Sequence, residues 1–291
     1  QNDPNGLYNL GSIYLNVPVY RDINKALLYL IKASELNNPL ALFNLGLLYL
    51  NDLQDYTKAR YYLEKSAELF KNTDAITNLG IIYFNGYGVK KDFYKAKEYL
   101  DLAMQQGNIN AVVNLGYFYK DTSNPMYNLS KAAHFFEQAA KHNHPASFME
   151  LATIYGKKHN YKEVAKYLKK AANIGNQYAI FNLGKLYYEG RGVERDINTA
   201  EKYFQKAAAS NNPNILYNIG LAYDFTKAEY YYKLAAQQNN ADAIFNLGNL
   251  YYKNNDYKNA FYYFDLAAKN NYSDAFLYHI FSFRFNHQNS K

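Results

Sequence analysis

The chain has 291 residues, of which nearly half are apolar and a fifth are charged, so it can bury a large core and is predicted to be ordered. It contains no cysteine, which excludes disulfide frameworks, thiol nucleophiles and thiolate metal sites. The net charge of +7 and the pI near 9.0 permit an acidic partner, but a modest basic excess is usually a solvated surface.

The sequence shows no candidate membrane segment or leader. No apolar run reaches the length of a membrane span, and no charged-then-apolar signal segment opens the chain. Since the chain begins with Gln1 and not with Met, we expect it to be a fragment or the product of trimming.

A short word, Asn-Leu-Gly or a close variant, recurs along the chain every 28 to 36 residues. The residues at its glycine position are Gly11, Gly46, Gly80, Gly116, Ala152, Gly184, Gly220, Gly248 and Ile280. A second word, most often Lys-Ala, follows each of the first eight, and its small residues are Ala26, Ala59, Ala96, Ala132, Val164, Ala200, Ala228 and Ala260. Such recurrence predicts a repeat architecture made of helices.

The spacing between the words separates a fixed connection from a variable one. From the small residue of each second word to the next glycine position the step is 20 residues, or 21 once, whereas the step within a unit runs from 8 to 16. Each unit therefore consists of helix A, a variable loop, helix B and a fixed return. The glycine of helix A and the alanine of helix B allow the two backbones to approach closely. Stacked units bury the apolar surface that a single helix pair would leave exposed.

We therefore predict an all-α fold, a right-handed superhelical α-solenoid of about eight antiparallel helix pairs plus a C-terminal helix, in a single repeat array over residues 1–291. The units are expected to start near residues 4, 39, 73, 109, 145, 177, 213 and 241, and the final helix to cover 273–287. Asp3 before Pro4 is a favourable helix start, and Ser273-Asp274 is expected to cap the final helix.

Three units depart from the pattern, and the final helix has an unusual surface. The first and fourth units keep a long loop without its glycines, and the seventh, "GLAYDFTKAEYYY", has a step of only 8 residues. Either its corner is truncated or a mobile loop is absent from the chain as given; we favour the second.

Phe281, Phe283 and Phe285 on the final helix predict that more chain, or a partner, covers it.

The segments "NLGIIYFNGYGVKKDFYKAKEYLDLAMQQGNINA" and "NLGKLYYEGRGVERDINTAEKYFQKAAASNN" resemble the Sel-one-like repeat, with its Leu-Gly-x-x-Tyr, Gly-x-Gly-Val and Lys-Ala-x-x-Tyr words. The eighth unit, "AIFNLGNLYYKNNDYKNAFYYFDLAAKNN", is more similar to the related tetratricopeptide repeat. The resemblance covers essentially the whole chain and implies a non-enzymatic protein that assembles complexes.

The sequence shows no catalytic or metal-binding motif. "GYGVKKD" and "GRGVERD" have glycines at phosphate-loop-like spacing, but they join two helices, so we expect the glycines to supply positive backbone angles. His134, His142, His144 and His159 lie in the fourth and fifth units, without the acidic or thiolate partners that a metal site needs. We therefore predict no cofactor, no metal site and no small-molecule substrate.

Lysines gather in "GKKHNYKEVAKYLKK", where Lys162, Lys166, Lys169 and Lys170 fall on one face of a predicted helix B. A solvated outer face is the simplest explanation, and an anionic partner or membrane surface is the alternative.

The asparagine of the first word falls on the polar stripe of helix A, opposite the apolar stripe. The candidate residues are Asn9, Asn44, Asn78, Asn114, Asn182, Asn218 and Asn246, and Tyr117, Tyr178, Lys185, Tyr188 and Asn249 share the stripe. Because a carboxamide both donates and accepts, a ladder of them along a concave groove could bind an extended peptide backbone. Inter-repeat bonding and a passive surface remain open. Glu150 and Tyr278 interrupt the ladder, so a continuous groove is expected from Asn9 to Asn114 or from Asn182 to Asn246.

The favoured function is a protein-protein interaction scaffold that binds a peptide or a protein segment. The alternatives are an RNA-binding helical-repeat protein, which the uneven unit lengths disfavour, and an enzyme, which the motif search disfavours. The sequence identifies neither the partner nor the compartment nor the oligomeric state, and membrane contact is expected only through a partner or the lysines.

Overall fold

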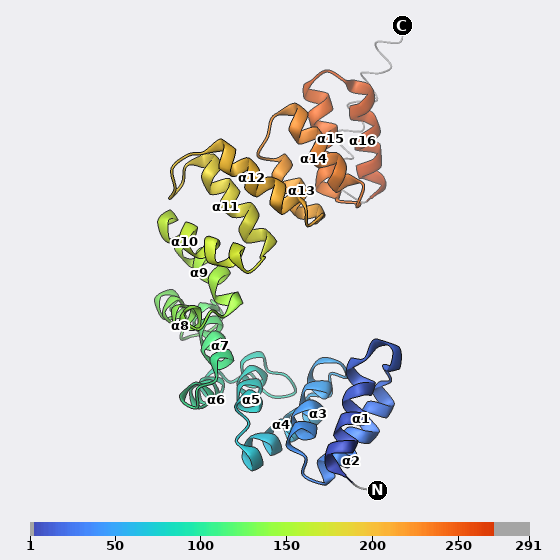
Figure 1. The fold of residues 1–291 in the computed structure, drawn as a ribbon, viewed down its shortest axis with the longest axis vertical. Coiled ribbons are helices and arrows are strands. Elements are labelled where there is room, and N and C mark those ends of the chain that lie inside the picture. Colours follow the sequence, from blue (N-terminus) through green and yellow to red (C-terminus); the bar gives the residue numbers. More distant parts are fainter. Residues whose placement is uncertain (1–2, 271–291) are drawn as a thin grey trace. The chain divides into compact units, whose positions relative to one another are not determined.

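The computed structural model describes residues 3–270, and within that range every regular element is helical (Figure 1). The A helices are α1 (Pro4–Asn16), α3 (Pro39–Asn51), α5 (Thr73–Asn85), α7 (Ile109–Lys120), α9 (Pro145–Lys157), α11 (Gln177–Glu189), α13 (Pro213–Gly220) and α15 (Ala241–Lys253). The B helices are α2 (Ile23–Glu35), α4 (Tyr56–Phe70), α6 (Phe93–Gln105), α8 (Leu129–Lys141), α10 (Tyr161–Asn173), α12 (Ile197–Ala208), α14 (Phe225–Ala236) and α16 (Tyr257–Lys269). A 3-10 turn, η1 (Pro18–Tyr20), lies in the first loop. The prediction of an all-α solenoid is confirmed; the helix expected at 273–287, with Tyr278 and its phenylalanines, lies outside the described residues.

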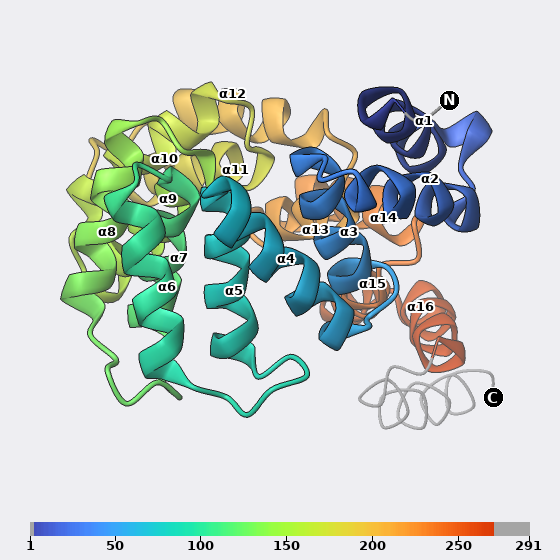
Figure 2. The same cartoon turned by 90° about the horizontal axis from the view of Figure 1, so that it is seen from below.

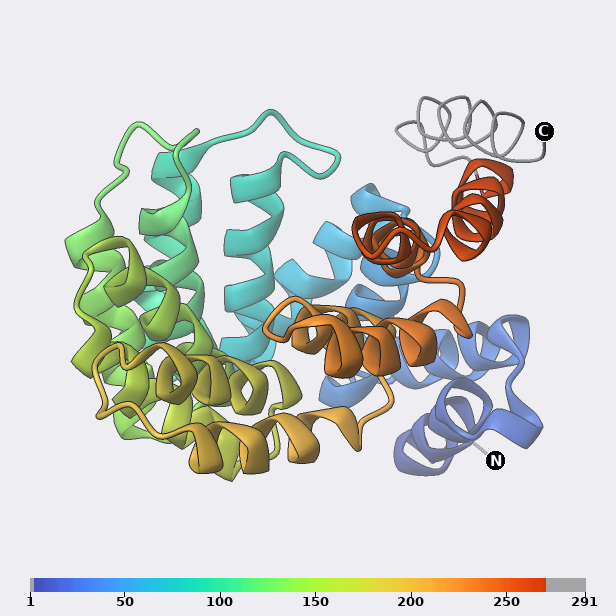
Figure 3. The same ribbon diagram turned by 90° about the horizontal axis from the view of Figure 1, so that it is seen from above.

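The chain divides into two compact units, unit 1 (Gln1–Leu151) and unit 2 (Ala152–Lys291). In unit 1 each helix packs against the next one along the chain, and α5 also contacts α7 (Figure 2). In unit 2 the helices from α10 to α16 follow one another in the same way, and α11 also contacts α13 (Figure 3). Direct contact between successive A helices places their side chains next to one another.

The glycine of each A helix lies against a large side chain of its own B helix. A Cβ added at Gly46 would lie 2.6 Å from Leu63 Cγ, and one added at Gly116 would lie 2.6 Å from the ring of Phe136. Leu63 and Phe136 are fully buried. The prediction that glycine lets the two helices approach closely is confirmed, and the close contact forms the centre of each repeat core.

An aromatic pair stacks between helix A and helix B in every repeat. The rings lie 5.6–5.9 Å apart at interplanar angles of 2–10° in the pairs Tyr14–Tyr29, Tyr49–Tyr62, Tyr83–Tyr99, Tyr119–Phe135, Tyr155–Tyr167, Tyr187–Tyr203, Tyr223–Tyr231 and Tyr251–Tyr263. Wherever the second word is Lys-Ala, its lysine lies over the helix A ring at 4.2–5.3 Å, as Lys95 does over Tyr83. Each such cation–π contact contributes about 0.5–1 kcal/mol at an exposed site.

The fixed return has a constant backbone shape. Nine residues before the glycine position the backbone turns left-handed, with φ between 50° and 84° at Asn37, Lys71, Gly107, Asn143, Gly175, Asn211 and Asn239. The next residue is an asparagine in six of the seven returns, and its side-chain oxygen accepts a bond from a backbone N–H in the first turn of the next helix A. A left-handed residue followed by a capping residue ends one helix and begins the next, which explains why the length of the return varies by at most one residue.

The two long loops with glycines adopt the expected positive angles. Gly86 and Gly88 have φ of 76° and 64°, and Gly190 and Gly192 have φ of 70° and 69°. The loop between α5 and α6 extends beyond the ends of these helices (Figure 2). A Cβ on Gly192 would lie 2.2 Å from the Tyr161 carbonyl carbon, so this loop also packs on the start of α10.

The seventh unit closes its corner by shortening helix A. Helix α13 ends at Gly220 after 8 residues, and α14 begins at Phe225. Asp224, at the start of α14, makes no side-chain capping bond. In the chain as given the corner is therefore truncated, and Tyr223 still stacks on Tyr231 across it.

Candidate functional site

Three pockets lie between successive A helices, and each is lined by the asparagine of an Asn-Leu-Gly word or its close variant. The α1–α3 pocket has a volume of about 380 Å³ and is lined by Leu15, Asn16, Arg21, Asn44, Leu47, Leu48, Asn51 and Asp52. The α5–α7 pocket, of about 190 Å³, is lined by Ile81, Phe84, Asn85, Leu100, Asn114, Tyr117 and Phe118. The α11–α13 pocket, of about 260 Å³, is lined by Phe181, Lys185, Tyr188, Glu189, Asn218, Leu221 and Ala222.

The three pockets use the same positions of the repeat. The asparagines, two residues before the repeat glycine, are Asn44, Asn114 and Asn218. Four residues after the preceding glycine stand Leu15, Phe84 and Tyr188. A pocket that recurs in the same register follows from the repeat geometry itself, because each A helix meets its neighbour in the same way.

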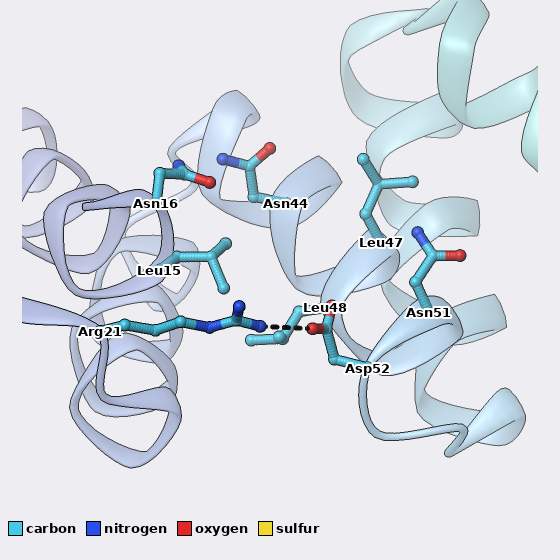
Figure 4. Close-up of a pocket in the computed structure, with 8 residues that line it drawn as sticks. All are labelled: Leu15, Asn16, Arg21, Asn44, Leu47, Leu48, Asn51 and Asp52. Carbon is cyan, nitrogen blue, oxygen red and sulfur yellow. Dashed lines mark hydrogen bonds and ion pairs between the residues drawn. The ribbon is translucent and has the colours of Figure 1, made fainter. Parts of the chain in front are cut away.

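The α1–α3 pocket shows the arrangement in detail. In Figure 4, Leu15 and Asn16 come from the first repeat and Asn44 from α3 of the second. Arg21 Nη2 donates to Asp52 Oδ1 at 3.2 Å, so the only two charged groups that line this pocket neutralise each other. The α5–α7 pocket has no charged lining residue. The α5–α7 pocket is therefore lined mainly by apolar side chains, whereas the α1–α3 pocket combines three leucines with three amides and a neutralised ion pair.

The ladder asparagines direct their amide groups in two ways. Asn78, Asn114 and Asn218 donate to the carbonyl four residues earlier in their own helix, at 2.7–2.8 Å. Asn44 and Asn246 donate to a tyrosine hydroxyl of the preceding A helix, Tyr8 at 3.4 Å and Tyr217 at 3.3 Å; Asn246 also donates to Asp242 O at 2.9 Å. Asn9 is exposed and the other six are half-buried. In these five asparagines the side-chain N–H groups are used in hydrogen bonds, and these bonds fix the orientation of the carboxamide oxygens.

The other predicted site residues are only partly brought together. Lys185 and Tyr188 line the α11–α13 pocket with Asn218, and Tyr117 lines the α5–α7 pocket with Asn114. Tyr178 is exposed on α11 and Asn249 is half-buried on α15; neither lines any of the three pockets.

Glu150 interrupts the asparagine series with a charge, as the sequence indicates. Its carboxylate accepts a bond from Lys120 Nζ. Burial raises the pKa of the Tyr117 hydroxyl, and the negative charge of Glu150 and a hydrogen bond to it raise this pKa further. Tyr117 therefore stays protonated and acts as a hydrogen-bond donor at the rim of the α5–α7 pocket.

A second set of asparagines, which sequence reasoning missed, connects the repeats. Asn108 caps α7 and also donates to Asp74 Oδ1 at 2.8 Å and Thr73 Oγ1 at 3.0 Å at the start of α5. Asn38 donates to Asn5 Oδ1 at 3.0 Å and Asn240 to Asn214 Oδ1 at 3.0 Å in the same way. The signal was available in the sequence, since an asparagine stands eight residues before the glycine position in six of the seven returns.

The histidines make local contacts. His134 Nε2 lies 2.9 Å from Gln138 Nε2, and His159 Nδ1 lies 3.5 Å from the Tyr161 hydroxyl. Across residues 3–270 no three or more His, Asp or Glu side chains are grouped to hold a metal ion. The same residues contain no helix with the length and hydropathy of a membrane span.

Comparison with protein families gives matches along most of the chain. The Sel1 repeat matches residues 4–38, 39–69, 73–108, 109–144, 150–176, 177–212 and 216–240. The tetratricopeptide repeat matches residues 242–274, the unit for which the sequence indicates that type.

Individual proteins with similar sequences or folds are known. A sel1-like repeat-containing protein of Acanthamoeba polyphaga mimivirus is 33% identical over 144 residues, which are 47% of this chain and 26% of that protein. A protective antigen of uropathogenic Escherichia coli with an SLR fold has a TM-score of 0.71 at 24% identity, over 97% of this chain and 65% of that one. A Sel1 repeat protein of Oxalobacter formigenes has a TM-score of 0.68 at 24% identity, over 96% of this chain and 87% of that one. The chain spans about a quarter to a third of the length of the first curated relatives.

Proposed function

The chain belongs to the Sel1 repeat family, with a tetratricopeptide repeat as its eighth unit, and on that premise we propose that its A-helix face binds an extended peptide segment of a protein partner. Sel1 and tetratricopeptide repeats form non-catalytic scaffolds that generally mediate protein interactions. The chain would then act as an adaptor and not as an enzyme.

The observation that carries the proposal is the recurrence of one pocket at one repeat register. Each pocket combines apolar side chains with an asparagine of the repeat, as Leu15 and Asn44 do between α1 and α3. Apolar walls with a few placed polar groups are what recognition sites for small groups and side chains generally offer. A row of such pockets fits a chain of alternating side chains and backbone amides better than it fits a single small molecule.

The chemistry of unit 1 defines the segment that it would bind. Its two pockets carry no net charge, so an apolar side chain enters them without leaving a buried charge unpaired. They are two repeats apart, and successive packed helices lie roughly 10 Å apart, so the pockets are separated by about 20 Å. An extended peptide covers that distance with about six residues. We therefore expect apolar side chains at positions i and i+6 of the bound segment.

The experiment is selection of binding peptides from a displayed random 16-residue library, with the intact chain as bait. The selected peptides are expected to carry two apolar residues about six positions apart and to bind nearly as well in 0.5 M salt, because the pockets of unit 1 are neutral. Replacing Asn44, Asn114 and Asn218 together by Ala removes three hydrogen-bonding groups, each of which contributes about 0.5–1.5 kcal/mol. Affinity is expected to fall about tenfold or more.

The matched control replaces two exposed tyrosines on B helices, Tyr94 and Tyr230, by Ala. This variant should bind the peptides as the parent does. If the control loses as much affinity as the asparagine variant, or if the asparagine variant binds normally, the A-helix face is not the binding surface.

A further inference from the structure

The basic excess of the chain lies entirely in one of its two units. Residues 1–151 contain 14 basic and 14 acidic residues, whereas residues 152–291 contain 18 and 11. Within unit 2 the segment 157–170 alone has six lysines and one glutamate. Most of the net charge of +7 is therefore concentrated in fourteen residues, and such asymmetry indicates an anionic partner more strongly than an even distribution does.

These six lysines are all exposed, and we call them together the lysine face. Its residues are Lys157, Lys158, Lys162, Lys166, Lys169 and Lys170. The first two lie at the corner before α10, and the other four follow one side of α10 at i, i+4, i+7 and i+8. Between Lys162 and Lys170 the helix rises by about 12 Å. The face is therefore a narrow strip of charge that can meet a flat surface along its length.

The lysine face is not explained by the stability of α10. Lys162 lies in the first turn, where a positive charge opposes the helix dipole. Like charges three and four residues apart on a helix also repel one another. The opposite side of α10 already buries Val164, Leu168 and Ala171 without help from the lysines.

Neighbouring acidic groups leave the surface positive. Glu163 on α10 pairs with Lys166 at 2.7 Å, and Glu189 at the end of α11 pairs with Arg191 at 3.2 Å. Arg191 itself lies 5.4 Å from the ring of Tyr161, at the start of α10. On α12 the two positions equivalent to Lys166 and Lys170 are again exposed lysines, Lys202 and Lys206. The next B helix thus carries exposed lysines at two matching positions.

We propose that the lysine face binds the surface of a bilayer that contains anionic phospholipid. Lysine is a flexible point charge without fixed geometry, which suits headgroups that diffuse in a plane. Single-stranded RNA is disfavoured because its binding uses exposed aromatic rings on which bases stack. The rings beside these charges, Tyr161, Tyr167 and Tyr187, are buried or half-buried and already lie against Arg191, Lys166 and Lys169. The A-helix pockets are formed by other helices, so a bound membrane and a bound peptide use different surfaces.

The test is flotation of the intact chain with vesicles of phosphatidylcholine alone or with 30% phosphatidylserine. The chain is expected to float only with the anionic vesicles at 0.1 M salt, and to dissociate at 0.5 M, where screening is strong. In Lys162→Glu/Lys169→Glu two attractive charges become repulsive, so binding should weaken about tenfold or more. Lys162→Gln/Lys169→Gln should lie between this variant and the parent.

The matched control is Lys32→Glu/Lys65→Glu, which replaces two exposed lysines on B helices of unit 1. It has the same net charge as Lys162→Glu/Lys169→Glu, and it should float with the anionic vesicles as the parent does. Equal binding to both kinds of vesicle, or an equal loss in the control, would overturn the proposal. So would tighter binding to a 20-nucleotide oligo(U) RNA than to anionic vesicles. None of these outcomes depends on peptide binding, so failure here leaves the proposed function standing.

Discussion

At the scale of single residues, the A-helix glycines are where helix A and helix B lie too close for an added side chain. We predict that Gly116→Ala destabilises the chain by about 1–3 kcal/mol, because the new methyl group would lie 2.6 Å from the ring of Phe136, which is fully buried and has no room to move. The measurement is urea unfolding followed by circular dichroism.

The control for this prediction is Gly156→Ala in α9, where the nearest atom to an added Cβ would be Val164 Cγ2 at 4.0 Å. Since alanine is the better helix former, this variant should be neutral or more stable by up to about 1 kcal/mol. Equal effects of the two substitutions would contradict the packing explanation.

Two kinds of asparagine are expected to behave in opposite ways. Asn108→Ala removes a helix cap and two bonds to the preceding repeat, so it should cost about 1–3 kcal/mol of stability. Asn114→Ala removes a bond to its own helix and should change stability by less than about 0.5 kcal/mol. Thermal unfolding of the two variants tests this, and a larger effect of Asn114→Ala would show that the ladder asparagine holds the repeats together.

At the scale of elements, five of the eight B helices begin with an aspartate whose side chain caps the helix. A backbone N–H bond from Lys25 and the charge of Lys25 lower the pKa of Asp22, and bonds from Lys58, Thr199 and Asn259 lower those of Asp55, Asp196 and Asp256. A carboxyl group with a lowered folded-state pKa stabilises the fold above its unfolded-state pKa, and this stabilisation is lost as the pH falls through the folded-state value.

We therefore predict that the melting temperature changes little from pH 7 to pH 5 and falls below about pH 4. Replacing the four aspartates by Asn keeps a capping oxygen that does not titrate, as Asn160 does at the start of α10. The quadruple variant should lose less of its melting temperature on acidification than the parent does. Parallel pH profiles of the two proteins would exclude these caps as a source of the acid sensitivity.

The long loops make a separate prediction. Gly192→Ala and Gly175→Ala both place a side chain at positive φ, 69° and 84°, which costs about 1–2 kcal/mol. At Gly175 an added Cβ has open space, whereas at Gly192 it meets the Tyr161 backbone. Gly192→Ala should be the more destabilising by about 1–3 kcal/mol. Similar denaturation midpoints for the two would mean that the loop does not pack on α10.

Much of this element-level structure could be predicted from the sequence, because the period of the words and the small residues are local signals. The Gly-x-Gly-Val words predicted the positive angles at Gly190 and Gly192. The partners of polar side chains could not be predicted, because they depend on which helices meet. The stacked tyrosines and the bridging role of Asn108 depend on contacts between helices and became visible only in the structure.

At the scale of the whole molecule, each of the two units supports a different proposal. Unit 1 has no net charge and contains two pockets whose lining has no net charge, whereas unit 2 carries the basic excess, much of it on α10. The sequence placed the candidate asparagines on one stripe, but it did not show that Asn44, Asn114 and Asn218 line pockets between successive A helices. Peptide binding by this stripe stays a prediction.

The most direct test of that prediction is to record the side-chain amide resonances of the asparagines by heteronuclear NMR while a selected peptide is added. The account predicts that the Asn44 and Asn114 resonances shift as peptide is added and stop shifting once the protein is saturated. The resonances of the capping residues Asn38 and Asn108 should not shift. Shifts confined to residues of the B helices, with the Asn44 and Asn114 resonances unchanged, would contradict it.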